Sequence, residues 1–363
     1  MYWIYADENS KKDIYNCTVS CKKSQFQELE NKKNHSITCE EKKEINASNK
    51  NSVNDISIID TDSSFFIDIK ELDITTVLLG EGAQGKVFKA KYRKGDVAVK
   101  TIRRYSKGTK YFEREINIFS KIRHPNIIQL MGVCIEETKR HFVMPLFDGH
   151  SLYDVIFDDQ IGDKYNFNLL QKSKIILDMS IGIAYLHLQL NNPIIHRDLK
   201  SWNVLVKTVP VTKLCDLGLS RYKNVATTAK TTAGKYKWKG TEIYLPPEVI
   251  QNANKNVNII DTPIDIWALA CVVVEIYTGF FTWDLLEYEN GLEEIFEKKI
   301  TPDVSKLPEM IQNIIRRCFS YDPNERPQIS EIVDVFDLNF KNMVKIFQAI
   351  KESPVIKKKP TLL

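Results

Sequence analysis

Apolar and polar positions alternate along the first half of the chain in the way that β-strands require. Residues 74–100 read as strand, glycine-rich turn, strand, turn and strand, with the second turn at KGD. Two more strands are predicted in residues 127–136 and 140–147. Before these, TKYFEREINIFSKI changes to helical spacing, which predicts a helix over residues 109–122 that ends before Pro125.

After Ser151 the apolar positions follow helical spacing. Helices are predicted over residues 151–156, 169–188 and 264–279, and the last is apolar nearly all round, which indicates a buried helix. Residues 340–350 predict an amphipathic helix that packs on the rest of the fold. Its apolar face comprises Phe340, Met343, Val344, Phe347 and Ile350. A strand-rich half followed by a helix-rich half is typical of an α+β protein.

Residues 1–63 have a different composition, rich in Lys, Glu, Asn and Ser with few apolar residues. Such a segment cannot bury enough apolar surface to offset its ordering entropy. We therefore expect a disordered polar tail. The sequence leaves open whether this tail only contacts solvent or also docks on a partner.

Composition excludes several classes of protein. The formal net charge is only +4, and no basic run interleaved with aromatic residues appears, so no nucleic-acid partner is expected. Seven scattered cysteines form no disulfide framework, and the Cys17/Cys21 pair lacks a second pair at zinc-ligand spacing. The first residues do not resemble a signal peptide, and no run of about 18 apolar residues predicts a transmembrane segment. We expect a cytoplasmic protein and leave access to the nucleus open.

Five short motifs carry the chemistry. In chain order they are GEGAQGKV at 80–87, VAVK ending at Lys100, HRDLKSWN at 196–203, CDLG at 215–218 and PPE ending at Glu248. A lone GxGxxG is weak, because a tight hairpin has the same pattern, but here a strand and an AxK follow it. The set, in this order and at this spacing, resembles the protein-kinase signature.

This resemblance implies a two-lobed protein-kinase fold over about residues 72–340. The small β-rich lobe would cover residues 72–147 and the larger helical lobe residues 148–340. Residues 341–363 would then form a C-terminal helix and a short basic tail. The cofactors implied are ATP and Mg²⁺, with Mn²⁺ as an alternative metal.

The resemblance assigns two sets of residues to ATP. Backbone amides of the glycine-rich loop would cover the phosphates, because its glycines let the backbone approach closely. This loop comprises Gly80, Glu81, Gly82, Ala83, Gln84, Gly85, Lys86 and Val87. The base would lie in an apolar slot formed by Leu79, Val87, Ala98, Leu205 and, at the rear, Met144. The hinge would consist of Pro145, Leu146 and Phe147, of which Pro145 offers only a carbonyl.

Charged residues of the motifs receive catalytic roles by the same resemblance. Lys100 would contact the phosphates and pair with Glu115 on the following helix, for which Glu113 is the poorer candidate. Asp198 would act as the base that accepts or orients the proton of the substrate hydroxyl, and Lys200 would reach the transferred phosphate. The metal ligands would be Asn203 and Asp216.

Other residues near the motifs are expected to be structural. His196 and Leu217 would pack with Phe119 and Leu130 in an apolar column, and Cys215 would be a small buried residue. Asp265 would hold the backbone of the catalytic loop. Glu248 and Arg326 would form an ion pair.

Regulation is predicted between Asp216 and Glu248. Arg197 is a candidate anchor for a phosphate on this loop, because a guanidinium binds phosphate bidentately. Candidate sites for an upstream kinase are Thr227, Thr228, Thr231 and Thr232. A threonine-rich loop would look the same without phosphorylation, so a constitutive loop is the alternative.

IKELDI, HPNII, MGVCIE and SYDPNERP resemble the tyrosine-kinase-like group, which includes Raf and mixed-lineage relatives. Lys200 and Thr241 favour protein substrates phosphorylated on serine or threonine. The alternatives are a dual-specificity kinase and a pseudokinase scaffold, although a pseudokinase usually lacks one of the residues corresponding to Lys100, Asp198 and Asp216. Departures from the family pattern, all away from the phosphates, are Pro246, Ala270 and His150.

Overall fold

The computed structural model describes residues 65–82, 85–103, 116–190, 192–217, 220–222, 242–253, 261–283 and 291–352. All of them belong to one compact unit, Ile58–Leu363. The polar tail predicted over residues 1–63 and the basic tail beyond residue 352 lie outside the described residues.

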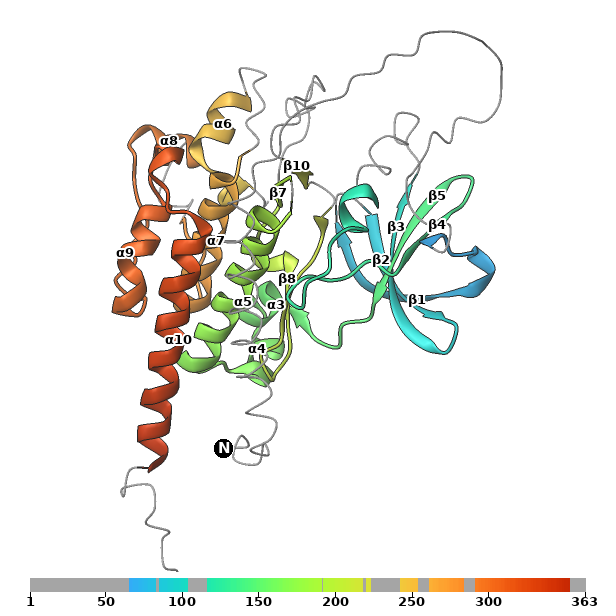
Figure 1. The fold of residues 1–363 in the computed structure, drawn as a ribbon, viewed down its shortest axis with the longest axis horizontal. Coiled ribbons are helices and arrows are strands. Elements are labelled where there is room, and N and C mark those ends of the chain that lie inside the picture. The colour runs from blue at the N-terminus through green and yellow to red at the C-terminus, as the bar shows by residue number, and fades with distance from the viewer. Residues whose placement is uncertain are drawn as a thin grey trace, which may run out of the picture. The chain divides into compact units, whose positions relative to one another are not determined.

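An antiparallel sheet forms the first part of this unit (Figure 1). Its strands run in the order β1-β2-β3-β5-β4. They are β1 Leu72–Gly82, β2 Gly85–Tyr92, β3 Gly95–Arg103, β4 Gly132–Ile135 and β5 Lys139–Pro145. The alternation of apolar and polar residues thus predicted these strands, because each has one face turned toward apolar neighbours.

The register places different chemistry on the two faces of this sheet. Val87 pairs with Lys100, and Ala98 pairs with Met144. Cross-strand partners share a face, as do residues two apart on one strand, so these four side chains lie on the same side. The opposite face is an apolar cluster of Ile67, Leu72, Ala90, Val97, Val99, Cys134 and Val143.

Two local predictions for this region were wrong. The turn before β3 is formed by Arg93 and Lys94, because Gly95 already pairs with Tyr92. Arg93 has the left-handed conformation in this turn, with φ 55°. The predicted strand at 127–136 is also shorter: only Gly132–Ile135 forms β4.

Helices dominate the rest of the unit (Figure 1). They are α3 Leu152–Phe157, α4 Asp159–Tyr165, α5 Leu169–Leu188, α6 Pro247–Ala253, α7 Pro263–Thr278, α8 Leu292–Glu297, α9 Glu309–Cys318 and α10 Ile329–Glu352. Short strands accompany them: β6 His150–Ser151, β8 Val204–Val206 and β9 Thr212–Leu214 form one sheet, and β7 Ile194–Ile195 pairs with β10 Arg221–Tyr222. The expected α+β, two-part kinase fold is confirmed. In the described part of the chain, no helix is both long and apolar enough to cross a bilayer.

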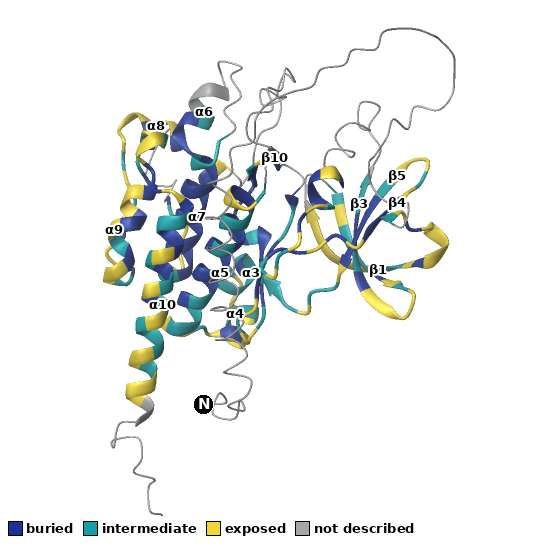
Figure 2. Ribbon diagram, viewed as in Figure 1, coloured by how far each residue is buried: buried dark blue, intermediate teal, exposed yellow. Residues whose placement is uncertain are grey.

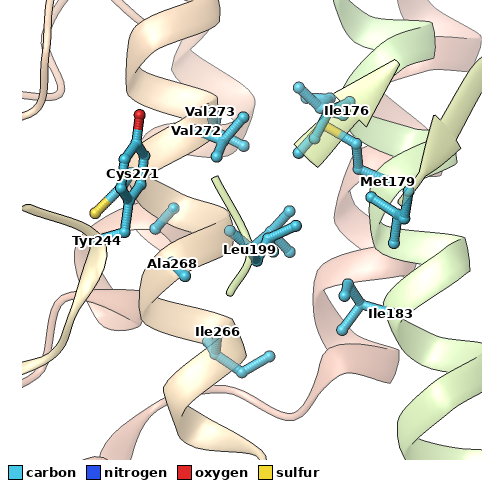
Figure 3. Packing of buried hydrophobic residues seen from close by; sticks show 14 of the residues in the cluster. Ile176, Met179, Ile183, Leu199, Tyr244, Ile266, Ala268, Cys271, Val272 and Val273 are labelled. Carbon is cyan, nitrogen blue, oxygen red and sulfur yellow. The ribbon is translucent and has the colours of Figure 1, made fainter. Parts of the chain in front are cut away.

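The helical core is built around α5 and α7, whose side chains are mostly buried (Figure 2). Figure 3 shows Leu199 between side chains of α5, such as Ile176, and side chains of α7, such as Val272. Leu199 is only 1% exposed. The segment that carries Asp198 is therefore fixed by the core itself.

The amphipathic helix predicted over residues 340–350 is the second half of α10, which runs without a break from Ile329. Asn339 on α10 donates a hydrogen bond to Ser173 on α5 (3.0 Å). Phe340 packs against the core, but Ile350 is 51% exposed. The predicted apolar face is thus covered only along its first part.

The predicted ion pair between Glu248 and Arg326 is confirmed. Two parallel hydrogen bonds of 2.7 Å join the guanidinium to the carboxylate, and both residues are buried. The same guanidinium donates to the carbonyl oxygen of Pro263 (3.0 Å) and lies 5.0 Å above the ring of Trp267. It therefore ties α6 to the start of α7.

Removing the guanidinium takes two charge-assisted hydrogen bonds from the buried carboxylate of Glu248. We expect Arg326→Met to lower the free energy of unfolding by about 3–5 kcal/mol, measured by urea denaturation. Adding Glu248→Gln should recover part of that loss. The control is Arg317→Met, which breaks the exposed pair with Glu331 and should change stability by less than about 1 kcal/mol. Equal effects of the two single variants would contradict the prediction.

Candidate active site

A buried carboxylate on α7 holds the backbone of the HRD segment. Asp265 accepts hydrogen bonds from the backbone N–H of His196 (2.7 Å) and of Arg197 (2.8 Å), as predicted. Its Oδ2 also lies 2.8 Å from Nε2 of His187 on α5. Burial opposes ionisation of Asp265, but the hydrogen bond and charge of His187 lower its pKa below the ordinary value. The carboxylate of Asp265 therefore stays charged.

Arg197 has a left-handed backbone, with φ 67°. This conformation costs a non-glycine residue about 1–2 kcal/mol, so the surroundings must impose it. The hydrogen bonds from the backbone amides of His196 and Arg197 to Asp265 impose this conformation. As a result, the direction of the backbone at the next residue, Asp198, is fixed.

Asp198 lies at the centre of a hydrogen-bonded group of catalytic-loop residues. Lys200 donates from Nζ to both carboxylate oxygens of Asp198, at 2.9 and 3.0 Å. Asn203 donates from Nδ2 to the Asp198 carbonyl oxygen (2.7 Å) and to its Oδ2 (3.0 Å). Asn203 lies in a short 3₁₀ turn, Ser201–Asn203, that brings it back toward Asp198. The structure thus brings together three of the predicted site residues.

The protonation of Asp198 reflects this environment. Burial raises its pKa, the charge and hydrogen bond of Lys200 lower it, and the charge of Asp216 raises it; the net direction is upward. A carboxylate with a raised pKa is a better proton acceptor than one in water.

Burial, and then the charge of Asp216, also raises the pKa of Cys215 to about 12, so this thiol stays protonated at neutral pH.

A second ion pair joins the sheet to the helical part. Lys100, near the end of β3 and 8% exposed, donates from Nζ to Oδ1 of Asp216 at 2.6 Å. Asp216 follows β9 and has a left-handed φ of 60°. The Cys215 N–H donates to the carbonyl oxygen of Asn203 (2.9 Å), which places Asp216 beside the catalytic loop. Sequence reasoning missed this pair, having assigned Glu115 as the acidic partner; Glu115 lies outside the described residues.

The glycine-rich motif forms the hairpin between β1 and β2. Gly80 pairs with Val87, Glu81 with Lys86 and Gly82 with Gly85, while Ala83 and Gln84 lie outside the described residues. Gly85 has φ 145°, and a Cβ there would come within 2.3 Å of the Thr101 carbonyl oxygen. A Cβ on Gly80 would meet no protein atom within 4 Å. Packing therefore explains the glycine at position 85 but not the one at position 80.

The residues assigned to the base slot come from both parts of the fold. Val87, Ala98 and Met144 lie on the face of the sheet that carries Lys100. Leu79 lies at an irregularity of β1 and is 46% exposed, and Leu205 is on β8 and half-buried. The hinge begins at the last residue of β5, Pro145, which is exposed, and continues through Leu146 and Phe147, which are half-buried.

The residues proposed for the apolar column are all buried. Phe119, Leu130 and Leu217 belong to one core cluster, and His196 is fully buried. Nε2 of His196 has no hydrogen-bond partner among the described residues, and Nδ1 lies 3.4 Å from the backbone N of Asp198. His196 thus contacts the backbone of the catalytic loop from inside the core.

Some predictions fall outside the described residues. They are those for Glu113, Glu115, the candidate phosphorylation sites at 227–232 and Thr241. Among the residues that the structure does describe, no cluster of three His, Cys, Asp or Glu side chains is arranged to hold a metal ion. A metal site here would depend on the oxygens of Asn203 and Asp216.

A buried carboxyl behind the catalytic loop was missed by sequence reasoning. Glu275 on α7 is fully buried, and within the described part of the chain neither carboxylate oxygen has a hydrogen bond of ordinary geometry. Burial raises its pKa to about 7, although the nearby hydroxyls of Tyr244 and Ser201 favour the charged form. These hydroxyls lie 3.1 Å apart. The signal was available, because Glu275 is an acidic residue inside a helix that is otherwise almost wholly apolar.

Comparison with known proteins agrees with this geometry. The family described as "Protein kinase domain" matches residues 74–335. The chain belongs to the protein kinase family. It is 31% identical over 279 residues to mitogen-activated protein kinase kinase kinase 7 of Bos taurus. The matched region covers 74% of this chain and 44% of that protein.

Two other relatives show the range of similar kinases. The dual specificity protein kinase shkA of Dictyostelium discoideum is 30% identical over 274 residues, covering 73% of this chain and 49% of that kinase. The serine/threonine-protein kinase STY17 of Arabidopsis thaliana is 28% identical over 275 residues, which cover 75% of this chain and 45% of that kinase. The resemblance to tyrosine-kinase-like kinases is confirmed. This kinase spans less than half the length of each of these three relatives.

The raised pKa of Glu275 predicts a specific dependence of stability on pH. Between its unfolded value of 4.5 and about 7, the folded kinase retains a proton that the unfolded chain has released. This group therefore destabilises the fold increasingly as pH rises through that range. Relative to the parent, Glu275→Gln should gain roughly 3 kcal/mol of stability between pH 5 and pH 8.

The measurement is urea unfolding of both proteins at a series of pH values. Glu293→Gln, an exposed change on α8, is the control and should follow the parent at every pH. A constant difference between Glu275→Gln and the parent across the series would show that Glu275 does not retain this proton.

Proposed function

We propose that this chain is an ATP- and Mg²⁺-dependent protein kinase that phosphorylates serine and threonine residues of proteins. The observation that carries the proposal is the arrangement of two carboxylates and two lysines beside Asn203. Asp198 is paired with Lys200, and Asp216 is paired with Lys100. This arrangement supplies a proton acceptor, metal ligands and two cations for phosphate groups.

The residues present fit the implied cofactor. The amide nitrogen of Asn203 is engaged by Asp198, which leaves its Oδ1 as the atom for Mg²⁺, together with carboxylate oxygen of Asp216. The open space beside Gly80 suits close approach of a phosphate to the backbone. Leu79, Val87, Ala98, Met144 and Leu205 would contact the base, and Pro145, Leu146 and Phe147 would lie at its edge. Mn²⁺, which also prefers oxygen ligands, is the alternative metal.

The reaction would transfer one phosphoryl group. The substrate hydroxyl oxygen forms a bond to the γ-phosphorus of ATP, the bond to the β–γ bridging oxygen breaks, and ADP leaves. Asp198 orients the hydroxyl and accepts its proton. Lys200, which is paired with Asp198, would also neutralise charge on the transferred group. Lys100 would bind the other phosphates with support from Glu115.

Serine/threonine specificity rests on Lys200 and Thr241, and a dual-specificity kinase is the second candidate. The relatives include kinases named for each class, so they do not separate the two. A pseudokinase scaffold is disfavoured because Lys100, Asp198 and Asp216 are all present.

The organisation of the rest of the chain is part of the proposal. We place the kinase domain at residues 72–340, a disordered polar tail at 1–63, and a C-terminal helix and basic tail at 341–363. The proposed location is the cytoplasm, and the proposed partners are protein substrates and an upstream kinase.

Asp216→Asn tests the catalytic assignment. Because this change removes a metal-ligating charge without changing side-chain volume, phosphorylation of a generic protein substrate should fall at least about 100-fold. The assay uses labelled ATP with Mg²⁺, followed by phosphoamino-acid analysis. Phosphoserine and phosphothreonine alone would support the proposed class, whereas added phosphotyrosine would favour dual specificity.

The matched control is Asp337→Asn, which removes the same charge from a pair with Lys341 on α10. It should retain parental activity. If Asp216→Asn keeps turnover within about threefold of the parent while folded, the metal-ligand assignment is wrong.

Phosphorylation between Asp216 and Glu248 is tested by replacing Thr231 and Thr232 with Ala. A phosphate there would gain charge-assisted hydrogen bonds from Arg197, so its loss should reduce activity several-fold. The parent is first treated with a phosphatase to establish that the loop carries phosphate. Unchanged activity of the variant, with phosphate present in the parent, would remove this regulatory role.

A further inference from the structure

Four aromatic side chains stack against one another beside the catalytic loop. We call Tyr153, Phe157, Trp202 and Phe281 the aromatic platform. The ring centroids of Tyr153 and Trp202 lie 3.5 Å apart with nearly parallel planes, and those of Phe157 and Phe281 lie 4.5 Å apart. Tyr153 and Phe157, one turn apart on α3, connect the two pairs at 4.9 Å.

Trp202 links this platform directly to the proposed chemistry. Its neighbours in the 3₁₀ turn point inward: Ser201 is fully buried and lies 3.1 Å from the Tyr244 hydroxyl, and Asn203 contacts Asp198. Trp202 between them is only half-buried. Consecutive Cα atoms lie about 3.8 Å apart, so the backbone of Trp202 is directly beside that of Asn203, which contacts Asp198.

The platform is not closed off by the core. Phe281 is 40% exposed, and Tyr153, Phe157 and Trp202 are half-buried. Large aromatic faces left in solvent beside reacting groups are typical of binding surfaces, because they offer apolar area with little conformational entropy to lose. Trp202 places this surface next to the turn that holds Asn203 against Asp198.

The stacked rings themselves favour an apolar side chain on a partner that binds there. Asp154 is the one charged residue of α3, and its carboxylate already accepts a hydrogen bond from Ser151 (2.7 Å). Lys200 is likewise engaged with Asp198. The platform is therefore aromatic in character, and the exposed Asp158 and Asp159 follow Phe157 directly in the chain.

We infer that the aromatic platform selects protein substrates that carry an aromatic or large aliphatic side chain close to the phosphorylated residue. The inference rests on the proposed kinase function and defines its substrate class. An extended substrate advances about 3.3 Å per residue, so side chains within about four residues of the acceptor lie within roughly 13 Å of it along the substrate. Trp202 and Phe281 are the specificity-determining residues.

The test uses the full chain and a set of peptides with one serine acceptor. Each peptide carries Phe, Lys or Ala at one position within about four residues of the acceptor. For the parent, kcat/KM at one or more positions should be about tenfold higher with Phe than with Ala, and Lys should give no such gain. Trp202→Ala and Phe281→Ala should reduce this ratio toward one, whereas Trp202→Phe should retain most of it.

Phe66→Ala is the matched control, because Phe66 is 39% exposed but lies before β1, where it bridges to Val133 of the sheet. It should leave the Phe-to-Ala ratio unchanged. Melting temperatures identify any variant that fails to fold. If Trp202→Ala fails to fold, the Phe-to-Ala ratio of Phe281→Ala alone tests the inference.

Equal kcat/KM for Phe and Ala peptides at every position would overturn the inference while the kinase function stands. Absence of any phosphorylation by the parent would instead contradict the proposed function. In that event, the Kd values of the same peptides with Ala in place of the acceptor serine are measured by fluorescence polarisation. Tighter binding of Phe peptides that is lost in Phe281→Ala would still support the platform as a binding surface, and equal Kd values would remove it.

Discussion

The geometry of the candidate site depends on the buried carboxylate of Asp265. It binds two successive backbone amides of the catalytic loop and thereby maintains the left-handed conformation of Arg197. A neutral side chain would accept fewer hydrogen bonds and would leave buried N–H groups unsatisfied. His187 keeps this carboxylate charged from the other side. The direction of the Asp198 side chain is consequently set by α5 and α7, which lie deep in the core.

Charge compensation organises the remainder of the site. Lys100 and Asp216 are separated by 116 positions in the chain, yet they form a 2.6 Å contact that joins the sheet to the segment after β9. Each would be unfavourable alone in a partly buried place. Their pairing therefore holds the two side chains together, as does the pairing of Asp198 with Lys200.

Much of this arrangement could be predicted because it is encoded locally. Strand alternation and the spacing of HRDLKSWN and CDLG indicated the sheet, the fold and the residues gathered around Asp198. What could not be predicted depends on contacts between distant segments. The pairing of Lys100 with Asp216 and the stacking of Trp202 on Tyr153 have no signature in the sequence. Glu275 is intermediate, since an acidic residue in an apolar helix signals burial but does not identify its neighbours.

The distance in sequence between the catalytic loop and its anchor has a consequence for biosynthesis. The hydrogen bonds from His196 and Arg197 reach a residue 69 and 68 positions later. Proteins are made from the N-terminus, so the loop leaves the ribosome well before Asp265 does. A nascent chain therefore carries His196, Arg197 and Asp198 before it carries the carboxylate that holds Arg197 in its left-handed conformation. The geometry of this loop can form only after Asp265 has been made.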